Sequence, residues 1–173
     1  LGEGKAKALQ SLVEAVAARA DGGELMALVL GKLPAFDAGG AAPGVKAALD
    51  RFLAAHEGTD EYFEYIGRFN LRDRVPQLVA HVQSDPEQKA AMQSLRQLVG
   101  WGEMEAVDRL VADAGARAPQ VLGALGVTGQ RAAVERLERY VVSGPPALRV
   151  PAVTALGRSR GGEQALLALA KAD

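Results

Sequence analysis

The sequence has no cysteine, few aromatic side chains and almost no net charge, and each shortage excludes a class of function. Because the 173 residues include no Cys, disulfides, thiolate metal sites, covalent c-type haem attachment and cysteine nucleophiles are excluded. Lys and Arg together number 20 against 21 Asp and Glu, so the whole chain presents no basic field to nucleic acid or an anionic membrane. No apolar run reaches the roughly 18 residues of a membrane-spanning helix. We therefore expect neither nucleic-acid binding nor a membrane span.

The residues that are abundant favour a folded all-α protein. Hydrophobic residues make up 49% of the chain and charged residues 24%, which are values typical of globular proteins. Aromatic residues make up only 5%, whereas Ala and Leu are common, and such small and aliphatic side chains let helices approach closely. The sequence begins with Leu and shows no signal peptide. We expect a single domain over residues 1–173 that is a piece of a longer chain, soluble, and either cytoplasmic or exported.

A short motif recurs along the whole chain, consisting of an aliphatic residue, a glycine, a polar stretch and a new amphipathic run. Its glycines are Gly31, Gly67, Gly100, Gly126 and Gly157, at intervals of 36, 33, 26 and 31 residues. A period near 30 residues is typical of arrays in which each repeat is one pair of helices. We predict that each glycine lies at the C′ position of a helix, where a left-handed backbone is needed.

Apolar residues at helical spacing flank each of these glycines. The stripe Val75, Leu78, Val79 and Val82, for example, follows the i, i+3, i+4, i+7 pattern. Asp85 and Thr128 are predicted N-caps, and Pro145–Pro146 and Gly161–Gly162 are predicted helix starts. The predicted helices are 4–19, 24–30, 44–56, 60–67, 75–82, 86–99, a stripe from Val107 to Val111, 118–125, 128–141, 146–156 and 161–171. These are about eleven helices, arranged as five hairpins and one leading helix, with no convincing strand.

Residues 148–169, Leu-Arg-Val-Pro-Ala-Val-Thr-Ala-Leu-Gly-Arg-Ser-Arg-Gly-Gly-Glu-Gln-Ala-Leu-Leu-Ala-Leu, resemble a HEAT-like repeat of the phycobilisome-lyase type. The shared features are an Arg, small residues, an Ala-Leu-Gly turn, an acidic residue and a helix with paired Leu, and Pro151 resembles the proline kink of a HEAT first helix. Residues 118–137 and 91–111 match more loosely. The resemblance implies an α-α superhelix, or α-solenoid, that serves as an interaction scaffold. Some relatives of this kind lie beside c-type haem modules in secreted bacterial proteins.

An aromatic cluster in residues 61–69 is the first candidate for partner binding. Tyr62, Tyr65 and Phe69 share one helical face, and Phe63 and Ile66 share another. Tyrosine combines a large contact area with a hydroxyl, so this cluster could anchor a protein or peptide. The alternative is that both faces are core, because a helix within an array packs against several neighbours.

A mixed set of charges in the last two repeats is the second candidate. It contains Arg131, Glu135, Arg136, Arg139, Arg158 and Arg160. If the second helices of the hairpins line a concave face, these side chains could hold an acidic segment or a phosphate. The alternative is an ordinary solvated face. A face like that of helical-repeat DNA glycosylases would require an excess of positive charge that the chain lacks.

No catalytic or metal-binding set can be assembled. His56–Glu57 is one His-Glu pair, the only other His is His81, and a metal site needs three or more converging ligands. We therefore expect a non-enzymatic scaffold that binds a protein or peptide, without a cofactor. The alternative is a HEAT-like enzyme or accessory protein with a concave site, whether tetrapyrrole lyase, DNA glycosylase or metal hydroxylase. Helices 4–19 and 161–171 could also pair two copies of the chain.

Overall fold

A computed structural model describes residues 11–19, 23, 25, 28–29 and 40–172 of the chain. Within these residues every regular element is helical, and the prediction of an all-α fold is confirmed for them. The chain divides into two compact units, unit 1 (Leu1–Arg72) and unit 2 (Asp73–Asp173), and each is described by itself. The predicted helix 24–30 and the glycine at position 31 lie wholly or largely outside the described residues.

Unit 1 contains a helical segment at 11–17, α3 (Pro43–Ala55) and α4 (Asp60–Arg68). A proline in the first turn starts α3, where the missing N–H costs nothing. Thr59 caps α4, since its hydroxyl oxygen accepts a hydrogen bond from the Tyr62 amide at 3.3 Å. The core is formed by Val45, Leu49, Phe52 and Leu53 of α3 with Phe63 and Ile66 of α4. The predicted helices 44–56 and 60–67 are thereby confirmed.

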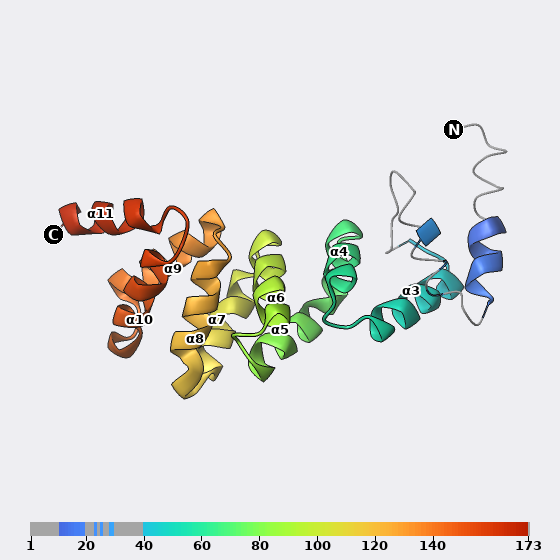
Figure 1. The fold of residues 1–173 in the computed structure, drawn as a ribbon, viewed down its shortest axis with the longest axis horizontal. Coiled ribbons are helices and arrows are strands. Elements are labelled where there is room, and N and C mark those ends of the chain that lie inside the picture. The colour runs from blue at the N-terminus through green and yellow to red at the C-terminus, as the bar shows by residue number, and fades with distance from the viewer. Residues whose placement is uncertain (1–10, 20–22, 24, 26–27, 30–39, 173) are drawn as a thin grey trace. The chain divides into compact units, whose positions relative to one another are not determined.

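Unit 2 is a succession of short helices (Figure 1). After the 3₁₀ turn η1 (Arg72–Arg74) at the boundary come α5 (Val75–Ser84), α6 (Lys89–Gly100), α7 (Met104–Asp113), η2 (Gly115–Arg117), α8 (Ala118–Val127), α9 (Arg131–Ser143), α10 (Pro146–Gly157) and α11 (Gly162–Ala172). Each predicted helix from residue 75 onward corresponds to one of these elements. The prolines behave as predicted, because Pro146 starts α10 and Pro151 lies inside it.

The helices of unit 2 pack in two interleaved series. Consecutive helices contact each other, most extensively α5 with α6 and α9 with α10. Helices two apart also pack, α6 with α8 and α8 with α10 in one series, α5 with α7 and α9 with α11 in the other. The shared core contains the fully buried leucines Leu78, Leu95, Leu98, Leu110, Leu122, Leu125, Leu137 and Leu156. Burial of each such side chain stabilises the fold by roughly 1.5–3 kcal/mol. Because these leucines come from each helix from α5 to α10, the stabilisation is spread along the unit.

The left-handed positions at the helix ends differ from those predicted. Gly67, Gly100, Gly126 and Gly157 lie inside α4, α6, α8 and α10, so the prediction that they are C′ residues is wrong. Positive φ angles occur two to four residues later, at Asn70, Gly102, Gly129 and Gly161. The clearest case is the end of α6, where Gly102 has φ of 76°. Its N–H bonds the Val99 carbonyl at 3.0 Å and the Glu103 N–H bonds the Leu98 carbonyl at 2.9 Å, which is a Schellman motif.

Gly126 has a different role, which is to let two helices approach each other. It is buried in α8 against α10, and a Cβ placed on it would lie 2.5 Å from the backbone oxygen of Ala155. Only glycine permits this separation. The glycine of the recurring motif therefore serves helix packing here, and a later residue ends the helix.

The two predicted N-caps are also wrong. The Asp85 carboxylate accepts a hydrogen bond from the Glu87 amide at 3.0 Å, and this turn precedes α6, which begins at Lys89. Thr128 is buried, and its hydroxyl donates to the Leu125 carbonyl at 2.7 Å. Threonine therefore satisfies the end of α8, whereas α9 begins later, at Arg131. In both cases the side chain forms its hydrogen bond within the turn that contains it, and a later residue is the N-cap of the next helix.

Candidate functional site

The predicted aromatic cluster is mainly part of the core of unit 1. Tyr62 is 2% exposed and Phe69 is 7% exposed, so neither offers its ring to a partner. Tyr65 is half-buried, and its ring lies 5.1 Å from that of Phe52 and 5.5 Å from that of Phe69. Burial raises the pKa of Tyr65, the Glu64 carboxylate raises it further, and Arg68 opposes the shift. These contacts agree with the alternative interpretation, in which the aromatic rings are structural.

The predicted charged residues of unit 2 divide into separate groups. Arg131 forms an exposed ion pair with Glu135 one helical turn away, at 2.8 Å, and such a pair contributes only a few tenths of a kcal/mol. Arg136 is occupied by Asp108 of α7, at 2.9 Å. The others, Arg139, Arg158 and Arg160, are exposed. Two of the predicted arginines, Arg131 and Arg136, are therefore already paired with carboxylates of the protein.

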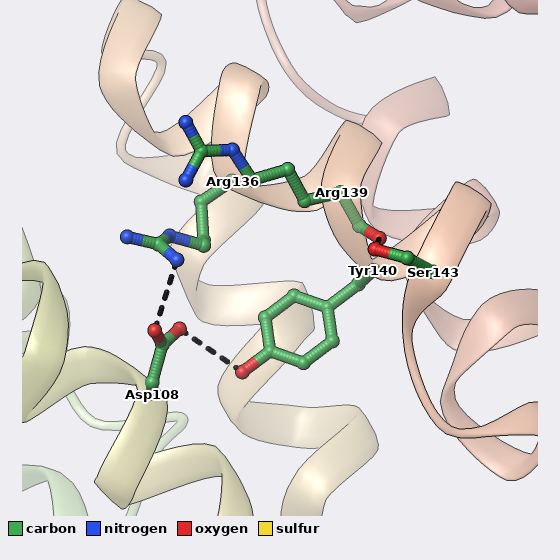
Figure 2. A network of polar contacts seen from close by, with 5 residues as sticks. All are labelled: Asp108, Arg136, Arg139, Tyr140 and Ser143. Carbon is green, nitrogen blue, oxygen red and sulfur yellow. Dashed lines mark hydrogen bonds and ion pairs between the residues drawn. The ribbon is translucent and has the colours of Figure 1, made fainter.

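Asp108, Arg136 and Tyr140 form a polar network that connects α7 to α9 (Figure 2). One carboxylate oxygen of Asp108 faces the Arg136 guanidinium, and the other accepts a hydrogen bond from the Tyr140 hydroxyl at 3.2 Å. Burial and the negative charge of Asp108, together with this hydrogen bond, raise the pKa of Tyr140 to about 12, against an opposing effect of Arg136. A neutral hydroxyl held in this way acts as a structural donor. Each member of the network has its partner within the protein.

A second set of contacts recurs at nearly constant sequence separation. The Arg117 guanidinium donates to the backbone carbonyls of Gln83 and Ser84, at 2.8 and 3.0 Å, where α5 ends. In the same way, Gln130 donates to a carbonyl of α6 over 34 residues. In unit 1, Arg51 donates to the Ala17 carbonyl, also over 34 residues. In each case a side chain satisfies a carbonyl 33 or 34 residues earlier, at or near the end of a helix.

These contacts were not predicted from the sequence, although the sequence contains a signal for one of them. The tetrapeptide Arg-Val-Pro-Gln at 74–77 recurs as Arg-Ala-Pro-Gln at 117–120. Both copies follow a 3₁₀ turn, and both place Pro in the first turn of the next helix. This repeated tetrapeptide marks the start of α5 and of α8, and in the second copy Arg117 lies at the end of α5, whose carbonyls it caps.

An open groove lies over α8 in unit 2, bordered by α10 and by the start of α6. Its volume is about 550 Å³. Its floor is formed by small residues, Gly123 and Ala124 of α8 and Ala155 of α10, and its apolar walls include Met92, Val127 and Val150. Three prolines, Pro86, Pro119 and Pro151, line it as well. The close approach of α8 to α10 at Gly126 holds the two main walls together.

The groove exposes apolar side chains that a folded protein usually covers. Val150 is 74% exposed and Val127 is 51% exposed. Contiguous apolar surface of this kind is typical of binding sites. The polar lining consists of Gln120 and Thr154 with two charged residues, Glu87 and Arg158. Such a groove is chemically suited to binding rather than to bond breaking.

Neither histidine belongs to a metal site in the described structure. His56 Nδ1 lies 2.9 Å from the Phe52 carbonyl oxygen, and its ring stacks on that of Phe52. His81 Nδ1 lies 3.2 Å from the hydroxyl of Ser94. Among the described residues no three His, Asp or Glu side chains are grouped to hold a metal ion. None of the helices in those residues has the length and apolarity needed to cross a membrane.

Comparisons with known families, curated proteins and solved structures found no match for this chain.

Proposed function

We propose that this chain is a HEAT-like α-solenoid that binds proteins without catalysis, and that the groove over α8 is its binding site. The two series of helix contacts in unit 2 are those expected of stacked helical hairpins. The side-chain-to-carbonyl contacts at separations of 33 and 34 residues support the same repeat. Arrays of this kind use the surface left exposed by stacking to bind their partners.

The observation that carries the proposal is the exposed apolar lining of the groove. Val150 is more exposed than any other large hydrophobic side chain in the described residues. It lies above a floor of glycine and alanine, where a partner side chain can reach the helix surface. Burial of such surface by a partner is worth about 25 cal/mol per Å², before the cost of association. A partner segment placed here covers the valine and the surrounding prolines.

Two valines of similar exposure provide a matched test. Val150 lines the groove, whereas Val142, at 63% exposure, belongs to α9 and is absent from the lining. The chain is immobilised and used to select binders from a library of random displayed peptides. We expect the unaltered chain and Val142→Asp to enrich the same peptides, with dissociation constants that agree within about threefold. Val150→Asp should weaken the same peptides by at least about tenfold, roughly 1.4 kcal/mol.

Two results would contradict the proposed function. One is that the folded chain enriches no peptide above an unrelated protein surface. The other is that the peptides selected bind Val150→Asp as tightly as they bind Val142→Asp, because the binding site would then lie elsewhere. As a control, circular dichroism of both variants must show the helix content of the unaltered chain.

A further inference from the structure

We infer that the groove takes an extended protein segment in one direction, with aliphatic side chains over α8, an acidic side chain against Arg158 and a basic side chain against Glu87. This inference rests on the proposed function and adds the chemistry of the partner to it. The proposed function requires only that a protein segment enter the groove. The inference fixes the charges of that segment and their order.

The two charged residues of the lining lie on opposite flanks of α8. Glu87 belongs to the turn before α6, and Arg158 is the C-cap residue of α10. Figure 1 shows α8 between these two helices, and α8 packs on both. Both side chains belong to exposed residues, and neither forms a salt bridge with another described residue. A segment crossing α8 therefore meets a negative charge on one flank and a positive charge on the other, which sets its direction.

The polar and apolar lining favours an extended chain over a lipid or a helix. The Thr154 hydroxyl donates to the Val150 carbonyl at 3.1 Å, so its oxygen remains able to accept a bond from a backbone N–H. The Gln120 amide both donates and accepts. A peptide backbone needs such partners, whereas an alkyl chain needs an apolar enclosure and a helix satisfies its own backbone. The groove is open on one side, which suits a segment whose other face stays in water.

The floor at Gly123 leaves room for the segment to approach the helix. A Cβ placed on Gly123 meets no atom within 4 Å, although the residue lies in the lining. Gly123→Leu therefore adds an uncharged side chain to the groove lining from a Cβ that meets no other atom within 4 Å. It separates steric blockage from electrostatic effects, and we expect it to weaken every groove-binding peptide by at least about tenfold.

Charge reversal tests the direction of the segment. Peptides selected with the unaltered chain should carry an acidic and a basic residue on either side of aliphatic residues. Arg158→Glu should weaken such a peptide by about tenfold or more, and a peptide with Lys in place of its acidic residue should recover the loss. Glu87→Lys should have the reciprocal effect on the basic residue. The matched control is Arg160→Glu, which alters an exposed arginine two residues from Arg158 that does not line the groove.

The outcomes separate this inference from the proposed function. If no peptide is selected, or if selected peptides ignore Val150→Asp and Gly123→Leu, both fail. If groove variants abolish binding but the peptides show no charge preference and bind Arg158→Glu and Arg160→Glu equally, the inference fails and the function stands. A bound peptide that becomes helical by circular dichroism also overturns the inference. Compensation by the Lys peptide on Arg158→Glu, without an effect of Arg160→Glu, supports it.

Discussion

The close contact between α8 and α10 predicts that alanine at Gly126 lowers the stability of the protein, whereas alanine at Gly123, three residues earlier, raises it. In Gly126→Ala the new methyl group would lie 2.5 Å from the Ala155 oxygen, where ordinary contact begins at 3.4 Å, so one helix must retreat by about 0.9 Å. Overpacking of this kind costs typically 1–3 kcal/mol. Replacing a helical glycine by alanine returns about 1 kcal/mol. Because the obstacle is backbone, we expect a net destabilisation of about 1–2 kcal/mol.

The control is Gly123→Ala in the same helix, where the added methyl group meets nothing within 4 Å. It should stabilise the protein by about 0.5–1 kcal/mol through helix propensity alone. In thermal unfolding followed by circular dichroism, the midpoint should fall by roughly 2–8 °C for Gly126→Ala and rise by roughly 1–4 °C for Gly123→Ala. If both variants raise the midpoint alike, the close approach of α8 and α10 is refuted.

Three further predictions concern the polar and aromatic contacts. The pKa of Tyr140 is raised from its ordinary value of 10 to about 12 in the folded protein, so its protonated hydroxyl stabilises the fold. This contribution is complete below pH 10 and is lost as the pH rises through 12. Tyr140→Phe should remove the part of this loss that the Asp108 network causes, as measured in denaturant titrations, while Tyr65→Phe, which leaves that network intact, should retain that part. Arg117→Ala should accelerate amide hydrogen exchange at the end of α5 by removing two donors worth roughly 1–3 kcal/mol together, whereas unchanged exchange there would show that the contact is not maintained in solution. Tyr65→Ala should lower the stability of unit 1 by about 1–3 kcal/mol because its ring packs on Phe52, and a neutral effect on unfolding would instead return Tyr65 to the candidates for a partner anchor.

Helix positions were predictable because the apolar stripes of this chain are regular. The stripe over Val75–Val82 is found in α5, and the run after Pro145 is found in α10. Helix ends were less predictable, because side chains such as Thr128 and Asp85 can bond either the helix behind them or the helix ahead. The sequence motif alone does not distinguish these two uses. The left-handed turns were displaced for a related reason, since a glycine such as Gly126 can serve packing instead of termination.

The candidate site was harder to predict than the fold. Charge and aromaticity drew attention to Arg136 and Tyr62, which the structure places in an internal ion pair and in the core. The groove instead combines residues that look unremarkable in sequence, such as Gly123, Val150 and Pro119, from helices that come together only through packing. Of the predicted residues, Arg158 alone lines it. A groove depends on which surfaces the neighbouring helices leave uncovered, and a one-dimensional pattern does not contain that information.

Three side-chain-to-carbonyl contacts between distant segments of the described residues run in the same direction along the chain. The donors Arg51, Gln130 and Arg117 all come later in the sequence than the carbonyls they satisfy, by 33 or 34 residues. During synthesis at about 5–20 residues per second, a helix end therefore waits roughly 2–7 s for its cap. For these three helix ends, the capping contact can therefore form only after the later segment of the chain has been made.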